Sequence, residues 1–307
     1  MMKKKILAIQ GSDLSKINIK TDTTLFLALE AQKREYEIYY FEPKDLSFLD
    51  GKVQAKCVQL TFFENKKTFY KINKKLNLNL SKAKVLLIRN EPPFNQQYIN
   101  TTFILEHIAN KVKILNHPKY IREVPEKLFS IRLTKYMPPT LISEDLMEIK
   151  KFFKRYKKVI IKPIDGYSGN EVILLKSFKI KIVNKYLNKY NHVIFQKYLP
   201  KISNGDRRVF IIDGKVMGSI TRVPKKGSIL SNMSKGAVAK VNLLTKKEIK
   251  ISKIVASMLV KNNIYFAGID FVQGQLIGDI NVTSPTGITT YYQLTGVNLA
   301  KYFWDNI

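Results

Sequence analysis

Cysteine and histidine are scarce in this sequence. Among 307 residues there is one cysteine, Cys57, and the three histidines, His107, His117 and His192, lie far apart. A single cysteine excludes an intramolecular disulfide framework and a zinc cluster built on cysteines. The histidines do not have the short spacing that is typical of a metal site. We therefore expect neither disulfides nor a histidine-rich metal centre.

Long apolar runs are also missing. No uninterrupted apolar segment approaches the ~18 residues that a helix needs to cross a bilayer. The basic start, MMKKK, is followed by an apolar run that is far too short for a secretory signal. We therefore expect no membrane partner. Together with the single cysteine, these absences favour an enzyme of the reducing cytoplasm.

Acidic residues are few compared with basic ones. There are 24 Asp and Glu residues against 53 Lys and Arg residues, which gives a formal net charge of +29 at pH 7. Such a charge favours anionic partners such as nucleic acids, membrane surfaces and phosphorylated ligands. The lysines are nevertheless scattered over the whole sequence among Asn and Ile residues, and no nucleic-acid-binding motif is present. We attribute the charge to compositional bias and expect no specific nucleic-acid partner.

The first third of the chain has the pattern of an α/β unit. With 45% hydrophobic residues, the chain is long enough for two or three domains with their own cores. Three short apolar segments predict strands: KILAIQ (5–10), YEIYYF (36–41) and KVLLIRN (84–90). Asp22 can cap a helix that runs through Arg34, and strand, helix, strand in this order indicates a parallel, helix-covered sheet. The Lys- and Asn-rich stretch 62–81 looks the least structured.

From about residue 121 the pattern changes to hairpins and helices. Three segments predict β-hairpins: 158–176, 207–223 and 266–281. The first has a tight glycine-containing turn, whereas Asp213-Gly214 and Gln273-Gly274 form two-residue turns that need positive φ angles. Helices are expected at about 177–190 and after a polar loop at 224–240. The predicted architecture is an α/β domain followed by antiparallel hairpin-and-helix units.

The last hairpin carries three oxygen-bearing side chains: Asp270, Asp279 and Asn281. In a regular hairpin Asp270 faces Ile277, and alternation along the strands then places the three side chains on one face. Mg²⁺ prefers such oxygen ligands, and a divalent cation would offset the cost of bringing two carboxylates together. We predict a cation site at this hairpin. The alternative is a set of ordinary surface carboxylates on its polar face.

Several basic residues can meet a phosphate. Lys162 ends a strand just before the turn 166–169, whose backbone N–H groups can cradle a phosphate beside it. The spacing is not that of a Walker loop, and a lysine in this position is often only exposed. The backbone N–H and C=O groups of the strand end 196–199 can form hydrogen bonds with the edge of an adenine. Three further basic residues can either contact a nucleotide or lie on the surface: Lys127, Arg208 and Arg222.

A set of segments spread over nearly the full length follows, in order and spacing, the pattern of a known family: INIKTDTT (17–24), LEAQKREYE (29–37), LIRNEPPF (87–94), NHPKYIREVPEKLF (116–129), IIKPIDGYSG (160–169), QKYLP (196–200), GDRRVFIIDG (205–214), TRVP (221–224), FAGIDFV (266–272) and INVTSPT (280–286). Through these segments the whole sequence resembles the bacterial glutathione synthetases of the ATP-grasp superfamily. NVTSPT together with the RNEPPF run is more typical of these synthetases than of ATP-grasp ligases in general.

The resemblance implies a fold and an activity. The fold class is α/β (α+β), with an N-terminal helix-covered parallel-sheet domain that binds substrate over 1–120. An ATP-grasp fold of two antiparallel-sheet and helix subdomains follows, over 121–199 and 200–307. The implied reaction joins γ-glutamylcysteine to glycine through an acyl phosphate, with ATP as co-substrate and Mg²⁺ (or Mn²⁺) as cofactor. Members of the family are commonly homotetramers.

The resemblance also implies roles for individual residues. The nucleotide would be bound by two lysines and by the small lid: Lys127, Lys162, Gly166, Ser168 and Gly169. The adenine would be read by Gln196, Lys197, Tyr198 and Leu199, and the larger lid would contribute Asn232. The metal would be held by Asp270, Asp279 and Asn281. Charge on the transferred phosphoryl group and the tetrahedral intermediate would be stabilised by Arg208 and Arg222. The peptide substrate would lie near Arg89, Ser284 and Thr286.

The sequence departs from the family pattern at a few positions. Asp279 stands where the family usually has Glu, and Ser168 stands where it has Gly. The other departures lie in the larger lid and after the NVTSPT segment: Ala237, Val238, Thr289 and Thr290. They predict altered substrate handling or slower turnover. Two alternatives therefore stay open, namely an ATP-grasp ligase with a shifted substrate and a basic binding protein that has lost catalysis.

Overall fold

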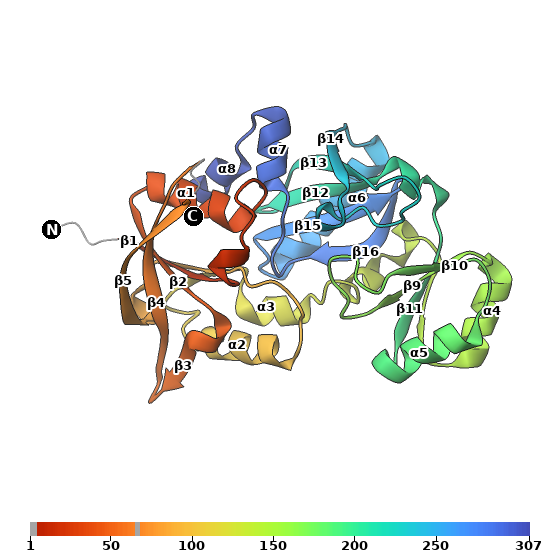
Figure 1. Cartoon of the computed structure of the whole chain (residues 1–307), viewed down its shortest axis with the longest axis horizontal. Helices are drawn as coiled ribbons and strands as arrows, with labels where there is room; N and C mark the ends of the chain where they lie inside the picture. The colour runs from red at the N-terminus through yellow and green to blue at the C-terminus, as the bar shows by residue number, and fades with distance from the viewer. Residues whose placement is uncertain (1–4, 65–67) are drawn as a thin grey trace.

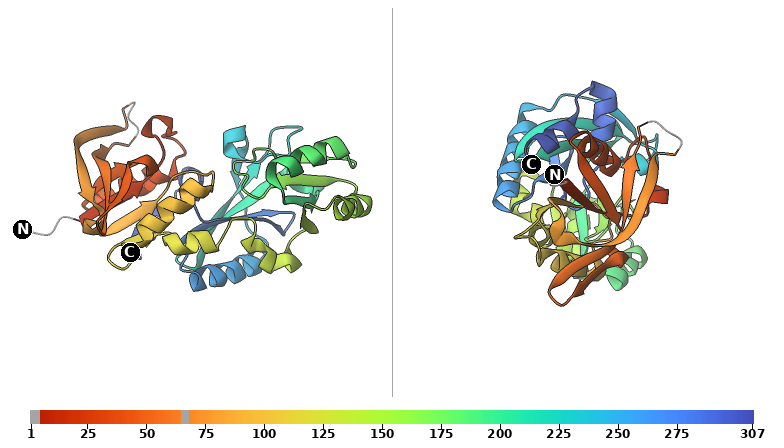
Figure 2. Two further views of the ribbon diagram at one scale, coloured as in Figure 1. Left: turned by 90° about the horizontal axis from the view of Figure 1, so that it is seen from below. Right: turned by 90° about the vertical axis from the view of Figure 1, so that its left-hand side faces the viewer.

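The computed structural model describes residues 5–64 and 68–307 of the chain. Its strands form three sheets that follow one another along the long axis of the molecule, with the sheet of the last third between the other two (Figures 1 and 2). This order confirms the predicted α/β fold class. No helix within the described ranges is long and apolar enough to cross a membrane.

The first sheet is mixed rather than purely parallel. Its four parallel strands are β1 (Lys5–Gln10), β2 (Tyr36–Phe41), β6 (Val85–Ile88) and β7 (Lys113–Leu115). Three antiparallel strands extend it: β3 (Leu46–Leu49), β4 (Lys52–Phe62) and β5 (Tyr70–Asn79). The expectation that 62–81 is the least structured stretch is therefore wrong for Tyr70–Asn79, whereas 65–67 lie outside the described residues. Most side chains of β5 are exposed, so its polar composition is that of a solvated edge strand and not of a loop.

Helices cover both faces of the first sheet. On one face lies α1 (Thr23–Lys33), which begins where predicted, because the Asp22 carboxylate accepts a hydrogen bond of 2.6 Å from the Leu25 N–H. On the other face lies α2 (Gln96–Glu106), which is followed after β7 by the short α3 (Pro118–Glu123). Alternate residues of β1 point into two separate apolar clusters, one on each face.

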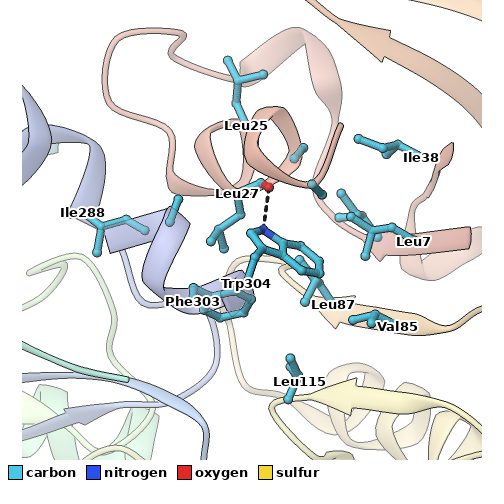
Figure 3. Packing of buried hydrophobic residues seen from close by; sticks show 14 of the residues in the cluster. Leu7, Leu25, Leu27, Ile38, Val85, Leu87, Leu115, Ile288, Phe303 and Trp304 are labelled. Carbon is cyan, nitrogen blue, oxygen red and sulfur yellow. Dashed lines mark hydrogen bonds between the residues drawn. The ribbon is translucent and has the colours of Figure 1, made fainter. Parts of the chain in front are cut away.

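The end of the chain completes the core on the α1 face. Helices α7 (Ile288–Thr295) and α8 (Leu299–Asp305) pack beside α1 (Figure 1). Figure 3 shows Trp304 and Phe303 of α8 among residues of the first sheet, with the Trp304 Nε1–H donating a 2.9 Å hydrogen bond to the Leu27 carbonyl. Side chains of the third sheet, including Phe210 and Phe266, belong to the same cluster. The first and last parts of the chain therefore share one core.

The second sheet is antiparallel, in the order β10 (Ile173–Leu175), β9 (Val159–Pro163), β11 (Val193–Lys197), β8 (Thr140–Ser143). Helices α4 (Leu146–Tyr156) and α5 (Ile180–Tyr190) pack against it through one apolar cluster. The predicted hairpin at 158–176 is confirmed, since Ile173 pairs with Ile161. Its turn is not tight, because it runs from 164 to 172 and forms a long loop.

The third sheet is also antiparallel, in the order β14 (Val238–Val241), β13 (Lys215–Val223), β12 (Asp206–Ile212), β15 (Phe266–Val272), β16 (Gln275–Asn281). Helix α6 (Lys246–Lys261) covers it and starts with a capping box formed by Thr245 and Glu248. Both predicted two-residue turns are confirmed. The φ angles are 49° at Asp213 and 69° at Gly214, and 54° at Gln273 and 70° at Gly274.

The register of the last hairpin differs from the regular one that was predicted. Pairing is regular from the turn to Phe271↔Leu276, but the next pair is Ile269↔Ile280, so the ladder shifts by two residues. The expected pairing of Asp270 with Ile277 is wrong. The extra residues form a bulge at Gly278, which has a φ angle of 95°. Because the shift is an even number of residues, the polar side chains keep to one face.

Candidate active site

A cavity of about 690 Å³ is lined by strands of the second and third sheets and by the segments that follow β1 and β6 of the first sheet. Every predicted site residue except Arg89 lines it, including both lysines, both arginines and the three residues of the predicted cation site. These residues come from segments as distant in sequence as 127 and 286, and β9, β11, β12, β13, β15 and β16 all contribute. The fold therefore gathers the separate sequence motifs into one site.

The two predicted phosphate lysines lie between the β9–β10 loop and β16. The Lys127 ammonium donates to the Gly166 carbonyl and lies 3.3 Å from the Glu126 carboxylate. Lys162 donates a 2.9 Å hydrogen bond to the Ile277 carbonyl and lies 3.4 Å from Asp279 Oδ1. Burial alone would lower the pKa of Lys127, but Glu126 and Asp279 raise it above its usual value. The Lys127 ammonium therefore stays charged at neutral pH.

The β9–β10 loop meets the larger loop that joins β13 to β14. Ser168 and Ser234 share a hydroxyl–hydroxyl hydrogen bond of 2.9 Å, and Lys235 Nζ donates a 2.8 Å hydrogen bond to Asn170 Oδ1. Ser168 has a φ angle of 54°, in the left-handed region that favours glycine. The substitution at this position therefore keeps the conformation of a glycine and adds a hydroxyl that joins the two loops.

The strand end at 196–199 offers only part of its backbone to a ligand. The N–H groups of Lys197 and Tyr198 already donate to the Pro139 and Lys158 carbonyls. The Leu199 N–H donates to no group in the described part of the chain. If an adenine binds here, Leu199 is the residue whose N–H is available to it.

Two arginines and two aspartates form a buried network on β12, β13 and β15. Arg208 donates to both oxygens of Asp270, and Arg222 donates to both oxygens of Asp206, at 2.7 and 2.6 Å, and also to Asp270, at 2.9 Å. Burial alone would raise the pKa of Asp270, but the two guanidinium groups lower it to about 2. For Asp206, burial and Asp270 raise the pKa against the effect of Arg222. The network fixes both arginines at the cavity wall.

The predicted cation ligands fit an oxygen-binding cation. Asn281 Oδ1 is buried and has no hydrogen-bond partner in the described ranges, while Asp270 and Asp279 supply carboxylates on the same wall. An unpartnered buried oxygen on the strand that also carries Asp279 suits a hard cation such as Mg²⁺. Those ranges hold no group of three His, Cys, Asp or Glu residues placed to bind a metal, so the set depends on the amide oxygen of Asn281.

Arg89 lies behind the cavity wall. It is 5% exposed, and its guanidinium donates to Thr24 Oγ1 at 3.1 Å and to the Pro285 carbonyl at 2.9 Å. The Ser284 hydroxyl in turn donates to the Arg89 carbonyl. Burial lowers the pKa of Arg89 to about 10. Arg89 therefore supports the segment that carries Ser284 and Thr286, and those two residues line the cavity.

Glu126 and Asp206 are among the cavity carboxylates that sequence reasoning did not select. Glu126 lines the cavity beside Lys127, and burial together with Asp279 raises the pKa of its carboxyl group, which Lys127 lowers in part. Asp206 pairs across the strands with Arg222 and also accepts from the Ser231 hydroxyl. The sequence did hold a signal for both, because Glu126 precedes Lys127 and Asp206 stands two residues before Arg208, and both basic residues were predicted to belong to the site. Sequence spacing alone does not show that the cross-strand partner is near.

Comparison with known proteins identifies the family. Residues 6–122 match the family model described as "Prokaryotic glutathione synthetase, N-terminal domain", and residues 126–296 match "Prokaryotic glutathione synthetase, ATP-grasp domain". The chain belongs to the prokaryotic glutathione synthetase family. These matches confirm the resemblance seen in the sequence. They also confirm that the chain is an ATP-grasp ligase. Members of this family use ATP and depend on a divalent metal.

Individual relatives of this family match over nearly their whole length. The chain is 35% identical over 311 residues to the glutathione synthetase of Mesorhizobium japonicum. The alignment covers 100% of this chain and 98% of that protein. It is 36% identical over 308 residues to the glutathione synthetase of Buchnera aphidicola subsp. Baizongia pistaciae, covering 98% and 95%. Among solved structures, D-cycloserine synthetase DcsG is similar with a TM-score of 0.67 at 13% identity, covering 98% of this chain and 97% of that one. This last likeness shows the fold alone.

Proposed function

We propose that this chain joins γ-glutamylcysteine to glycine at the expense of ATP. In the first step the cysteinyl carboxylate attacks the γ-phosphorus of ATP, which forms an acyl phosphate and releases ADP. In the second step the glycine amine attacks the acyl carbon, and phosphate leaves with the former C–O bond electrons. The products are glutathione, ADP and phosphate. A carboxylate is a poor electrophile, and its phosphorylation supplies the leaving group that the amine can displace to form the amide bond.

One observation carries the proposal: lysines, arginines and oxygen donors meet in one cavity. Lys127 donates to a carbonyl of the β9–β10 loop, where phosphates can be cradled, and Lys162 of β9 lies 3.4 Å from Asp279 in the same cavity. The buried Arg208 and Arg222 lie on the same wall beside Asp270. Fixed positive groups of this kind stabilise charge that develops on a transferred phosphoryl group and on a tetrahedral intermediate.

We assign further roles on the same basis. Gly166, Ser168, Gly169 and Asn232 line the phosphate end, and Gln196, Lys197, Tyr198 and Leu199 line the adenine end. Asp270, Asp279 and Asn281 would hold Mg²⁺ or Mn²⁺, which when bound supplies neutralisation of phosphate charge. Ser284 and Thr286 contact the peptide donor, while Arg89 holds their segment in place.

The organisation of the protein is part of the proposal. We assign the peptide substrate to the domain at 1–120 and the nucleotide to the subdomains at 121–199 and 200–307. We place the enzyme in the cytoplasm, where ATP is available and where its free, buried Cys57 is consistent with a reducing compartment. A homotetramer by resemblance to the family is the proposed assembly, and we propose no specific nucleic-acid or membrane partner.

The test is ADP release by the purified full-length chain with γ-glutamylcysteine, glycine and millimolar Mg²⁺. We expect ADP release that requires both substrates and the metal, with glutathione formed in equal amount. ADP release that is independent of the two substrates, or no release at all, would contradict the proposal.

A ligase with a shifted substrate is the second candidate. Thr290 lines the cavity, and the Thr289 hydroxyl donates a 2.9 Å hydrogen bond to the Asp22 carbonyl, at positions where the family commonly has a charged pair. A panel of amines and γ-glutamyl peptides in the same ADP assay separates the two candidates. Higher kcat/KM with another acceptor or donor would favour the second.

A further inference from the structure

One end of the cavity is built by the N-terminal part of the chain. Asn18, Thr21 and Asp22 lie there, next to Thr286 and Thr290 from the end of the chain. The strands β9 and β11 with the proposed nucleotide end belong to the opposite side of the molecule (Figure 1). With the nucleotide and the cation at their proposed places, the N-terminal end is the space left for the peptide donor.

Asp22 is held rigidly in this wall. One carboxylate oxygen, Oδ1, accepts the 2.6 Å hydrogen bond from the Leu25 N–H that caps α1. Its own N–H donates to the Asn18 carbonyl at 2.9 Å, and its carbonyl accepts from the Thr289 hydroxyl. Both the start of α1 and the start of α7 therefore fix its position, so that its second carboxylate oxygen has a defined place at the cavity wall.

The charge of Asp22 is not matched by a cation in contact with it. Within the described ranges its carboxylate forms no ion pair, because the Arg89 guanidinium donates instead to Thr24 and Pro285. Burial raises the pKa of the Asp22 carboxyl group, and the backbone N–H groups of Leu25 and Thr24 together with Arg89 offset only part of that rise. A positively charged group of a bound ligand, placed next to the Asp22 carboxylate, would offset the cost of burying this negative charge.

The other carboxylates of the cavity already have cationic partners or lie in the open. Asp206 and Asp270 pair with arginines, and Asp279 and Glu126 pair with lysines. Glu91 lies at the exposed rim. Asp22 is therefore the partly buried carboxylate of this wall that is left to receive a cation from a bound molecule.

The peptide donor carries one such cation. γ-Glutamylcysteine has two carboxylates and a single ammonium group, which is the α-amino group of its glutamyl residue and takes no part in the reaction. We propose that Asp22 is a specificity-determining residue that binds this α-ammonium group. The inference rests on the proposed function, and it extends it by naming the group of the donor that is recognised and the residue that recognises it.

The experiment compares γ-glutamylcysteine with glutarylcysteine, which has the same chain without the α-amino group. Asp22→Asn is the test variant, because Asn caps a helix as well as Asp and keeps the Leu25 hydrogen bond. In the unchanged enzyme we expect KM for glutarylcysteine to be about 10- to 100-fold higher, the range for a hydrogen bond to a charged group. In Asp22→Asn we expect KM for γ-glutamylcysteine to rise to that level and the preference to disappear, with KM for ATP unchanged.

Asp13→Asn is the matched control, because Asp13 also caps a helix, by accepting from the Ser15 N–H, and lies outside the cavity. It should keep the preference for the amino donor. If Asp22→Asn keeps the preference as well, the role of Asp22 is refuted while the proposed function stands. If the unchanged enzyme releases no ADP with either donor, both proposals fail. Should Asp22→Asn unfold, Asp22→Ser, which also caps helices, replaces it in the same comparison.

Discussion

Arg208 and Asp270 lie opposite each other on neighbouring strands, and the guanidinium of Arg208 donates to both oxygens of the Asp270 carboxylate. Asp270 also accepts from Arg222 and is a proposed ligand of the cation. One carboxylate thus connects both arginines to the cation site. The positions of the positive groups are consequently fixed before any substrate binds.

Arg208→Lys should lower kcat by about 100-fold, because one ammonium cannot replace the two parallel hydrogen bonds of the guanidinium. The measurement is steady-state ADP release at saturating substrates. Arg207→Lys is the control. Arg207 directly precedes Arg208 on β12, and it forms an ion pair with Glu248 away from the cavity. A similar loss in both variants would show that the effect is one of strand stability.

Asn281→Leu should have opposite effects on stability and on metal use. The amide oxygen has no partner in the described part of the chain, so a leucine of similar size removes a desolvation cost of about 1–3 kcal/mol. We expect a higher melting temperature without metal and at least about a tenfold higher Mg²⁺ concentration for half-maximal activity. An unchanged Mg²⁺ requirement would remove Asn281 from the ligand set.

Glu126→Gln should stabilise the metal-free protein at neutral pH. Burial and Asp279 raise the pKa of Glu126 in the folded state, so the folded chain binds more protons than the unfolded chain above about pH 4.3. The free energy of unfolding of the unchanged protein therefore falls as pH rises through that window, whereas the variant lacks this fall. Urea unfolding at several pH values measures the difference, which should vanish below about pH 4. Glu123→Gln, an exposed residue of α3, should show no such pH dependence.

Leu27→Ala should destabilise the whole molecule and not α1 alone. Leu27 is fully buried in the core that the first sheet shares with α8, and such truncations cost about 2–5 kcal/mol. Trp304 is the one tryptophan of the chain, so its fluorescence reports the docking of α8. Fluorescence and far-UV circular dichroism should give the same, lowered denaturation midpoint, whereas Lys33→Ala on the exposed side of α1 should leave it nearly unchanged. A separate, earlier fluorescence transition would show that α8 detaches by itself.

The hairpins and the first helix can be predicted because their signals are local. Asp213-Gly214 and Gln273-Gly274 need positive φ angles, and Asp22 needs only the N–H groups of the next turn. The residues proposed for the site were selected through the resemblance, because spacing does not reveal which loops converge on the cavity. The strand β5 cannot be predicted from its composition, since an edge strand with exposed side chains has the polarity of a loop.

Other features depend on tertiary contacts. The bulge at Gly278 shifts the register of the last hairpin beside Met137, a residue that is distant in sequence. Arg89 points to Pro285 and Thr24 rather than into the cavity because their oxygens satisfy its buried guanidinium. The partners of Asp206 and Asp270 lie on other strands. In each case the deciding group is remote along the chain.

The position of α7 and α8 against α1 has a consequence for synthesis of the protein. The ribosome makes these helices after all three sheets, yet they fill the apolar face that the first sheet leaves open. A nascent chain therefore cannot finish its N-terminal core until the segment around Trp304 has emerged, and it exposes that face to chaperones in the meantime. The same docking brings Thr289 to Asp22, so that a chain completes the proposed donor end only after α7 has been made.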